Sequence, residues 1–505
     1  MISKLKKYRY EILIFLVEAV CMVLELVASR LLAPYFGSSQ IVWTSVIAII
    51  LLSASIGNYF GGKIADGEDR QKHLRWILII AALLTMLIPI IQEFIISSIV
   101  SSIFSIKIGA ILATGALFLA PSIFLGMVPP IILKEKIIAV EEAGKTAGRV
   151  NAISTVGSIV GTILGGFFFV PYFGSLQVIF VLSAILFFLS FVPEGKRSVK
   201  EKIIIAIFVI VSIIGLTFYT HSNNSMEQRI LNGEMDIKIS YDTEYGKAVI
   251  YNTIYDGNRV RMLNIDSGYE SATLIDEEDK YELPFDYLKE YDRIINTQDN
   301  IEDALMIGGA GYAYPKYYIS NYLDKKMDVV EIDGKITELA KKYFFLNDLI
   351  DEYDINNTKR LELINDDGRI YLNQNTKKYD VILNDAFAGN VPAKVLTTKE
   401  ANERIKDSLK ENGFYMTNII GSAEGKHSRF LKAEVNTLKQ VFKYVYVVPI
   451  SNDIFYDSTV NVNNIVVCSE REMSIDNIMD LKIDENEIII TDDYCPVDSL
   501  VEIEL

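Results

Sequence analysis

Residues 303–333 read DALMIGGAGYAYPKYYISNYLDKKMDVVEID, and this stretch decides the fold of the second half of the chain. The apolar run Ala304–Ile307 has the length of a buried strand and ends in a glycine-rich turn. A helical stretch follows, and a second strand covers Met327–Ile332. A strand, a crossover helix and another strand form the unit from which parallel sheets are built. The stretch therefore predicts an α/β domain with a parallel sheet.

The turn of this unit carries residues suited to a nucleoside. Gly308, Gly309 and Gly311 let the backbone approach a ligand closely at the end of the first strand. Glu331 stands near the end of the second strand, 23 residues after Gly308, where a carboxylate accepts both ribose hydroxyls. The turn lacks the third spaced glycine of a dinucleotide fingerprint. The pattern therefore favours an adenosine-type ligand.

The alternation of strands and helices continues to the end of the chain. Asp366 and Asp367 follow the third strand, and Asp385 follows the fourth. Because such sheets bind ligands at the carboxyl ends of their strands, these residues belong to the predicted site. We expect a doubly wound, Rossmann-like sheet of the methyltransferase type over residues 301–505. Its remaining strands are expected at residues 361–364, 379–384, 414–419, 445–448 and 464–467, and its helices at 334–345, 399–410 and 427–442.

A small β-unit, residues 223–300, is expected before this domain. Residues 237–241 and 247–255 alternate between apolar and polar side chains, as half-buried strands do. The sequence Asp256-Gly257-Asn258 is typical of a hairpin turn, and it leads into a further strand at residues 259–265.

Charge and hydropathy divide the 505 residues into two unlike parts. Residues 1–220 contain 18 Lys and Arg against 12 Asp and Glu, whereas the rest contains 31 against 53. The mean hydropathy of +0.25 is high for a chain with 23% charged residues. These values exclude a single globular domain, a disordered chain and a nucleic-acid binder with a basic footprint. Three cysteines and three histidines are too few for a disulfide framework or a His-rich metal site, so no metal is expected.

The first 222 residues are expected to form an all-α, multi-pass bundle in the cell membrane. Apolar stretches long enough to cross a bilayer recur seven times. Lys and Arg gather in alternate loops, 16 against 2, which places the N-terminus in the cytoplasm. An odd number of spans then places the acidic half outside. The expected spans are residues 11–33, 41–62, 76–97, 108–130, 151–171, 174–192 and 203–220.

Three features of the membrane half stand out. The sequence Pro-Tyr-Phe-Gly-Ser occurs at residues 34–38 and again at 171–175, which indicates a parallel internal duplication. Glu18 and Glu25 lie seven residues apart and therefore on one helix face. They form a pathway for a cation or amine, a substrate contact, or a polar clamp between helices, for which Arg30 and Asn58 are the candidate partners. A glycine stripe at residues 157, 161 and 165 indicates close helix packing.

The motifs of the second half resemble those of the spermidine synthase, or polyamine aminopropyltransferase, family. The resemblance extends to the branch of that family in which a multi-span membrane domain is fused to the synthase domain. In that branch an intramembrane Glu precedes a Pro-x-x-Gly turn, as Glu25 does here. The matching segments of the second half are Ile307–Gly311, Val329–Asp333, Asp367–Arg369, Tyr379–Asp385, Val391-Pro392 and the segment from Asp242 to Gly246.

The resemblance implies a role for each residue of the predicted site. Glu331 would hold the ribose of decarboxylated S-adenosylmethionine or of the product methylthioadenosine, and Asp367 would contact the adenine. Asp385 would take a proton from an acceptor amine, which then attacks the carbon beside the sulfonium. The implied partners are a nucleoside sulfonium and a polyamine, and the implied process is polyamine biosynthesis. Whether the chain forms a homodimer stays open.

Two departures from the family pattern leave the reaction open. Gly311, or its neighbour Ala310, stands where the synthases carry an aspartate that pairs with the donor's amino group, and Ala388 replaces an aspartate that holds the diamine. Loss of the first aspartate would admit the carboxylate of intact S-adenosylmethionine. Methyl transfer, aminocarboxypropyl transfer, a lyase reaction and a non-catalytic nucleoside or polyamine sensor fused to a transporter-like domain therefore remain alternatives.

Tyrosines give a weaker indication of a cationic substrate. The side of the membrane on which the soluble half lies stays open. Tyr245, Tyr287 and Tyr312 are candidate substrate contacts, because aromatic walls suit cations. The charge rule places the soluble half outside the cell, whereas the donor of such a reaction is made in the cytoplasm.

Overall fold

The computed structural model describes residues 8–37, 40–103, 105–137, 142–194, 203–204, 208, 210–211, 225–266, 268–388, 391–450 and 458–501. The chain separates into two compact units, each considered by itself. The first is formed by residues 1–227 with 240–247, and the second by residues 228–239 with 248–504.

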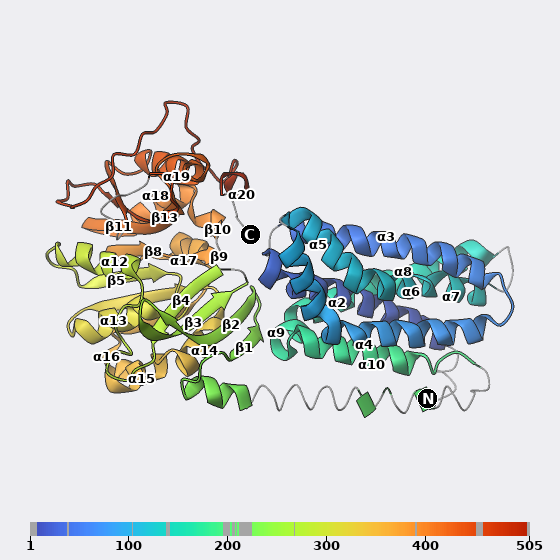
Figure 1. Cartoon of the computed structure of the whole chain (residues 1–505). Helices are drawn as coiled ribbons and strands as arrows, with labels where there is room; N and C mark the ends of the chain where they lie inside the picture. Colours follow the sequence, from blue (N-terminus) through green and yellow to red (C-terminus); the bar gives the residue numbers. More distant parts are fainter. Residues whose placement is uncertain are drawn as a thin grey trace. The chain divides into compact units, whose positions relative to one another are not determined.

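The first unit is built from long apolar helices that run alongside one another (Figure 1). Five helical stretches are long and apolar enough to cross a membrane, and they coincide with the first five predicted spans. The sixth predicted span is a helix of only 15 residues, and most of the seventh lies outside the described residues. The described part of the chain therefore supports five spans where the sequence predicted seven. The five stretches are Arg9–Phe36, Ile41–Ala65, Arg70–Ser102, Lys107–Lys136 and Ala143–Phe169.

The fourth and fifth of these stretches are not uniform α-helices. The fourth contains a short π-helix, η1, and the fifth ends in another, η3. The helices of the unit are α2 (Arg9–Phe36), α3 (Gln40–Ala65), α4 (Arg70–Ser102), α5 (Ile106–Thr114), η1 (Gly115–Leu119), α6 (Ala120–Gly126), α7 (Val128–Lys136), α8 (Ala143–Leu164), η3 (Gly165–Phe169), α9 (Val170–Phe173) and α10 (Ser175–Leu189).

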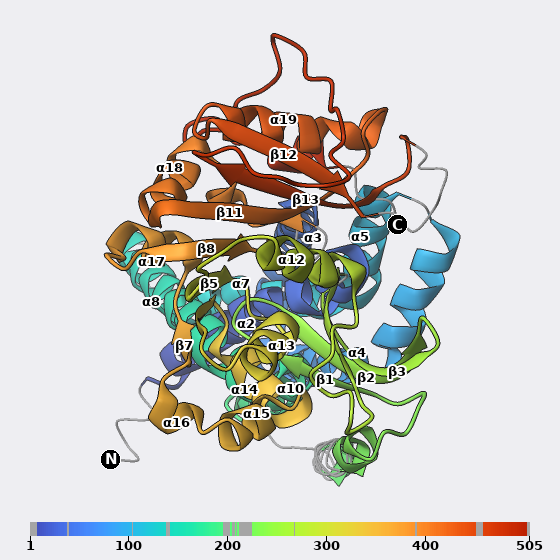
Figure 2. The same cartoon turned by 90° about the vertical axis from the view of Figure 1, so that its left-hand side faces the viewer.

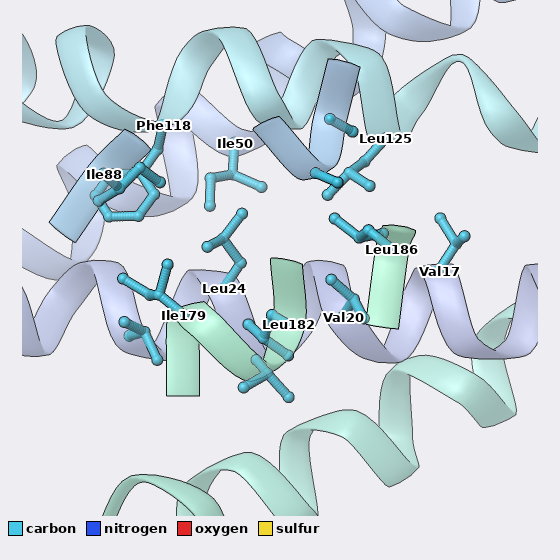
Figure 3. Packing of buried hydrophobic residues seen from close by; sticks show 14 of the residues in the cluster. Val17, Val20, Leu24, Ile50, Ile88, Phe118, Leu125, Ile179, Leu182 and Leu186 are labelled. Carbon is cyan, nitrogen blue, oxygen red and sulfur yellow. The ribbon is translucent and has the colours of Figure 1, made fainter. Parts of the chain in front are cut away.

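Aliphatic side chains fill the centre of this bundle, with α2 in the middle. Figure 3 shows Val17, Val20 and Leu24 of α2 facing side chains from α3, α4, α6 and α10. Glycines bring α8 close to α2, since a Cβ atom at Gly157 would lie 2.3 Å from the Phe15 carbonyl oxygen. A Cβ atom at Gly161 would likewise lie 2.4 Å from the Ala19 carbonyl oxygen. The prediction of close helix packing along the glycine stripe is therefore confirmed.

The Pro-Tyr-Phe-Gly parts of the two copies, residues 34–37 and 171–174, each end a helix in the same way. Gly37 follows the last turn of α2 with φ 76°, and Gly174 follows α9 with φ 81°. A glycine in the left-handed region ends a helix without a Cβ penalty. Each copy thus joins the end of one helix to the start of another. The larger duplication remains a prediction.

A four-stranded antiparallel sheet occupies residues 238–274. The predicted turn joins its central hairpin, with Asp256 and Gly257 at φ 47° and 77°. The fourth strand was not foreseen from the sequence. The strands, in the order 1-2-3-4, are β1 (Lys238–Asp242), β2 (Lys247–Tyr255), β3 (Asn258–Ile265) and β4 (Gly268–Leu274).

The main sheet has seven strands in the order β12-β13-β11-β8-β5-β6-β7 (Figure 2). It is mixed rather than purely parallel, because β13 runs antiparallel to both β11 and β12. The seven predicted strands and their Rossmann-like arrangement are confirmed, and the single reversed strand is the correction. The strands are β5 (Asp303–Ile307), β6 (Lys326–Glu331), β7 (Leu361–Asn365), β8 (Tyr379–Asn384), β11 (Leu409–Gly421), β12 (Tyr444–Pro449) and β13 (Val462–Ser469).

Helices pack on this sheet around an apolar core that includes Leu305 and Ile382 from neighbouring strands. A two-stranded ribbon, β9 (Phe387–Ala388) with β10 (Val391–Pro392), follows β8 and lies close to the strand ends. The helices are α12 (Asp286–Asn296), α13 (Ala313–Asn321), α14 (Gly334–Tyr343), α15 (Leu346–Glu352), α16 (Ile355–Thr358), α17 (Gly368–Gln374), η4 (Lys394–Leu396), α18 (Lys399–Asp407), η5 (Lys426–Ser428), α19 (Arg429–Lys439) and α20 (Val497–Leu500).

Candidate active site

The glycine turn after β5 is held by the carboxylate of Glu331 at the end of β6. Glu331 Oε2 accepts hydrogen bonds from the backbone N–H groups of Gly309 (2.8 Å) and Ala310 (2.9 Å). Its Oε1 accepts from Asp333 N–H (3.0 Å). Burial raises the pKa of Glu331, and these three N–H groups oppose the rise. Two carboxylate oxygens have about four acceptor positions, so room for a ribose hydroxyl remains.

The glycines of this turn act through close packing. Gly308 has φ 95°, and a Cβ atom there would lie 2.5 Å from the Asp385 carbonyl oxygen. At Gly311, a Cβ atom would lie 2.7 Å from Ser271 Oγ and 3.2 Å from the ring of Phe344. A side chain at position 311, one of the two positions where the family pattern carries an aspartate, would therefore collide with Ser271 unless Ser271 moved.

The two aspartates after β7 have local backbone partners. Asp367 Oδ1 accepts from the N–H groups of Arg369 (2.8 Å) and Ile370 (3.0 Å), which makes Asp367 the N-cap of α17. Asp366 Oδ1 accepts from Asp367 N–H at 2.8 Å. Both residues lie at the same edge of the sheet as Glu331, since Asn365 pairs with Glu331 across β7 and β6.

Asp385 follows β8 and is held from two sides. Its Oδ2 accepts from Tyr287 Oη (3.0 Å), and its Oδ1 accepts from Asn418 Nδ2 (3.2 Å). Burial raises the pKa of the Asp385 carboxyl to about 6, and the hydrogen bonds from Asn418 and Tyr287 oppose that rise. A carboxyl with this pKa is ionised at neutral pH yet basic enough to take a proton from a bound amine.

The three candidate tyrosines have different surroundings. Tyr287 contacts Asp385 directly. Tyr312 is completely buried and its hydroxyl lies 2.8 Å from Thr337 Oγ1, so it packs beneath the glycine turn. Tyr245 is 52% exposed in the turn between β1 and β2, outside the compact unit that contains Asp385. The structure therefore brings Tyr287 to Asp385 and Tyr312 to the glycine turn, whereas Tyr245 belongs to the other compact unit.

Three residues near Asp385 were not predicted from the sequence. Asn418 lies near the carboxyl end of β11, one residue beyond the pair Thr417–Asn384. Tyr291, on α12, is buried, and its ring centroid lies 6.0 Å from that of Tyr287. Glu434, on α19, is 3% exposed. A polar residue at a strand end and a charged residue on an apolar helix face are the signals that could have identified Asn418 and Glu434.

Glu18 and Glu25 lie on α2, in the other compact unit. Glu18 is hydrogen-bonded to Ser154 and Ser158 of α8, and both Glu18 and Glu25 are partly buried. These hydrogen bonds join α2 to α8, and the choice between a pathway, a substrate contact and a polar clamp stays a prediction. Among the described residues, no group of three His, Cys, Asp or Glu side chains is arranged to hold a metal ion.

Known proteins resemble this chain along most of its length. A family profile described as "Spermine/spermidine synthase domain" matches residues 291–472. "Polyamine aminopropyltransferase 2" of Aquifex aeolicus is 23% identical over 457 residues, which cover 88% of this chain and 85% of that protein. "Polyamine aminopropyltransferase" of Bacillus cytotoxicus is 32% identical over 120 residues, or 24% of this chain and 42% of that protein.

Two solved structures resemble the chain less closely. A probable spermidine synthase from Corynebacterium glutamicum has 23% identity and a TM-score of 0.40, covering 48% of this chain and 84% of that one. Spermidine synthase from Thermotoga maritima has 18% identity and a TM-score of 0.37, covering 54% and 86%.

The fold is an α/β, Rossmann-like domain whose candidate site lies at the carboxyl ends of β5, β6, β7 and β8. Residues 291–472 match the spermine/spermidine synthase domain, and the chain is similar to a polyamine aminopropyltransferase along 88% of its length, which supports an enzyme of the aminopropyltransferase type.

Proposed function

We propose that this chain is a membrane-anchored aminopropyltransferase that uses decarboxylated S-adenosylmethionine, with Asp385 as the general base. One observation carries the proposal: a carboxyl with a raised pKa follows β8, held by Tyr287 and Asn418. The family relatives support the reaction class. The glycine turn and Glu331 form the matching nucleoside side of the site at the end of β5 and β6.

The proposed reaction has two steps. The acceptor binds as an ammonium ion, which has no lone pair, so Asp385 first removes one proton from it. The freed amine nitrogen then attacks the CH₂ carbon attached to the sulfonium, and the C–S bond breaks with both electrons going to sulfur. Methylthioadenosine leaves as a neutral thioether, and the positive charge passes to the new secondary ammonium. A sulfonium is already a good leaving group, so positioning supplies much of the rate.

The donor is proposed to bind at Glu331, Asp366 and Asp367, on the side of the site opposite Asp385. Glu331 would accept the ribose hydroxyls with the acceptor positions that the backbone N–H groups leave. Asp366 and Asp367 lie near the expected adenine position, with Asp367 Oδ1 already capping α17. Gly311 offers no carboxylate to the donor's amino group, so intact S-adenosylmethionine is the donor that competes with the decarboxylated form.

The membrane half is proposed to anchor the enzyme in the cell membrane. Five apolar helical stretches of 25 to 33 residues exceed the roughly 20 residues that a bilayer requires. The distribution of Lys and Arg favours a cytoplasmic N-terminus. Fusing phosphatase or a fluorescent protein to the C-terminus would report the side of the soluble half, because the two reporters work on opposite sides of the membrane.

The reaction is tested with the purified full-length chain in detergent. Decarboxylated and intact S-adenosylmethionine are each supplied with and without an amine, and mass spectrometry follows methylthioadenosine and the aminated product. We expect both products only with the decarboxylated donor and an amine. Formation of methylthioadenosine from the intact donor without an amine would replace the proposal with a lyase, and methylation of an acceptor would replace it with methyl transfer.

A further inference from the structure

A small pocket lies beside Asp385 and does not include it. Asn384 and Ala386, which flank Asp385 in the chain, line one wall, and Asn418 lines another. Phe387 of the β9–β10 ribbon contributes an apolar side, and Glu434 of α19 contributes a carboxyl. Because Asn418 also donates to Asp385 Oδ1, the pocket adjoins the catalytic carboxyl.

Glu434 is unusual among the acidic residues of this domain. It is 3% exposed on a helix face whose other residues, Leu431, Val435 and Leu438, are completely or almost completely buried. Within the described ranges, no Lys or Arg forms an ion pair with it, and its Oε2 has no hydrogen-bond partner. Burial raises the pKa of Glu434 well above its ordinary value, and a hydrogen bond from Asn402 opposes this. Burying an ionised carboxylate without a partner is costly, so Glu434 keeps its proton in the unliganded protein, and a cation bound in the pocket would favour its ionised form.

The side chains around the pocket have too many acceptors. Four buried side-chain oxygens in this region lack a donor within the described part of the chain: Asn384 Oδ1, Asn402 Oδ1, Asn418 Oδ1 and Glu434 Oε2. The orientation of Asn418 is determined, since its Nδ2 faces a carboxylate, which can only accept. An ammonium group has three donors and no acceptor. It is therefore the ligand whose hydrogen-bonding groups complement this pocket.

We propose that Glu434, with the amide oxygens of Asn384 and Asn418, binds the ammonium group of the acceptor that is remote from the reacting nitrogen. The acceptor is then a diamine or a longer polyamine cation. This inference rests on the proposed function. It also accounts for the missing family aspartate at Ala388, because a second carboxyl from α19 takes the place of that anchor. Glu434 is assigned to substrate binding and not to proton transfer.

The test compares two acceptors that differ by one ammonium group. Full-length wild type, Glu434→Gln and the control Glu403→Gln are assayed with 1,4-diaminobutane and with n-butylamine. Glu403 is exposed on α18, so its variant makes the same chemical change away from the pocket. In Glu434→Gln we expect KM for the diamine to rise about 10- to 100-fold, the size of a charged hydrogen bond. The kcat for the diamine and all values for n-butylamine should stay within about threefold.

Calorimetric titration of 1,4-diaminobutane in the presence of methylthioadenosine separates this inference from the proposed function. Diamine binding that depends on Glu434, without turnover, supports the pocket and overturns the proposed reaction. Turnover with an unchanged diamine preference in Glu434→Gln overturns the pocket and leaves the reaction intact. Absence of both binding and turnover overturns both.

The melting temperature of the unliganded Glu434→Gln protein should equal or exceed that of wild type, since a buried unpaired carboxyl is removed. A lower melting temperature would show a structural role for Glu434 and overturn the assignment.

Discussion

The two sides of the carboxyl edge of the main sheet differ in how well their buried acceptor oxygens are supplied with hydrogen-bond donors. On the β6 side, three backbone N–H groups converge on Glu331, and two more converge on Asp367. On the β8–β11 side, buried oxygens of Asn384, Asn418 and Glu434 have no donor among the described residues. The first side presents carboxylates already held by the backbone. The second side lacks donors, which a cationic ligand would bring.

This difference shows how ligand chemistry can be inferred from what a site leaves unsatisfied. Buried polar groups in native proteins nearly always have partners. A group without one therefore indicates what the ligand supplies. On the β6 side the residual acceptor capacity suits the hydroxyls of a ribose, whereas on the β8–β11 side the surplus suits an ammonium. The two sides thus correspond to the two proposed substrates.

Asp385→Asn is the change that should most strongly affect the β8–β11 side. Without a base the bound ammonium keeps its proton, so kcat should fall about 10²- to 10⁴-fold. Binding of methylthioadenosine, measured by calorimetry, should remain, because the nucleoside side is untouched. Loss of nucleoside binding together with activity would show that the two sides are not separate.

Folding of the Asp385→Asn variant can be checked in the same preparation. The pKa of Asp385 is raised from 3.8 to about 6 in the folded protein. The free energy of unfolding therefore falls as the pH rises from 3.8 to about 6, because Asp385 ionises less readily in the folded protein. Asparagine does not ionise, so the variant avoids this loss of stability. The variant should melt at or above the wild-type temperature at pH 7.5. Asp407→Asn, at an exposed position of α18, serves as the matched control for activity.

Glu331→Gln should affect the β6 side next most strongly. A glutamine has one acceptor oxygen, so it cannot accept from the glycine turn and from Asp333 N–H on its two sides at once. Affinity for the donor and for methylthioadenosine should fall about 10- to 100-fold, while KM for the amine stays near wild type. Glu338→Gln, an exposed change on α14, should alter neither value. A selective effect on the amine would contradict the division of the site.

Gly311→Ala should lower stability by about 1–3 kcal/mol, as overpacking does. Its Cβ atom would meet Ser271 Oγ at 2.7 Å and Cβ at 2.9 Å. The substitution Ser271→Gly removes the side chain that the new Cβ atom would meet. In that background, adding Gly311→Ala should no longer lower stability below that of Ser271→Gly alone, as measured by thermal unfolding. If Gly311→Ala instead leaves stability unchanged and weakens donor binding, position 311 contacts the ligand rather than the small sheet.

Tyr287→Phe should give the smallest change, confined to the pH profile. In wild type, log kcat/KM should rise with unit slope up to pH about 6, where Asp385 loses its proton, and then level off. The variant loses a hydrogen bond that favours the ionised carboxyl, so the inflection should move to higher pH. Tyr317→Phe, which removes a hydrogen bond to Asp292 instead, is the control. An inflection that stays in place would show that Tyr287 does not set the basicity of Asp385.

Much of the main sheet could be predicted from the sequence because each strand is a short apolar run that ends at a turn. The predicted strand at Met327–Ile332 differs from β6 by one residue at each end. The reversed direction of β13, which runs antiparallel to both β11 and β12, was missed. The seventh span could not be tested, since residues 205–207, 209 and 212–220 lie outside the described ranges.

In the candidate site, the residues at strand ends could be predicted from the sequence, but their partners from distant segments could not. Glu331 and Asp385 were found because each stands at or just beyond a strand end, which is a property of the local sequence. Tyr287 and Asn418 lie 98 and 33 residues from Asp385 along the chain, and no local pattern reports that separation in space.

The sequence by itself determined the two-part organisation, the apolar helices, the strand and helix alternation, and the carboxylates at the strand ends. These depend on composition and on periodicity over a few residues. Only the tertiary structure decided that a side chain at position 311 would meet Ser271, that Glu331 holds the glycine turn, and that Glu434 reaches the pocket beside Asp385. Such contacts join segments far apart in the chain, and their energies depend on burial and on which partners folding brings within hydrogen-bond distance.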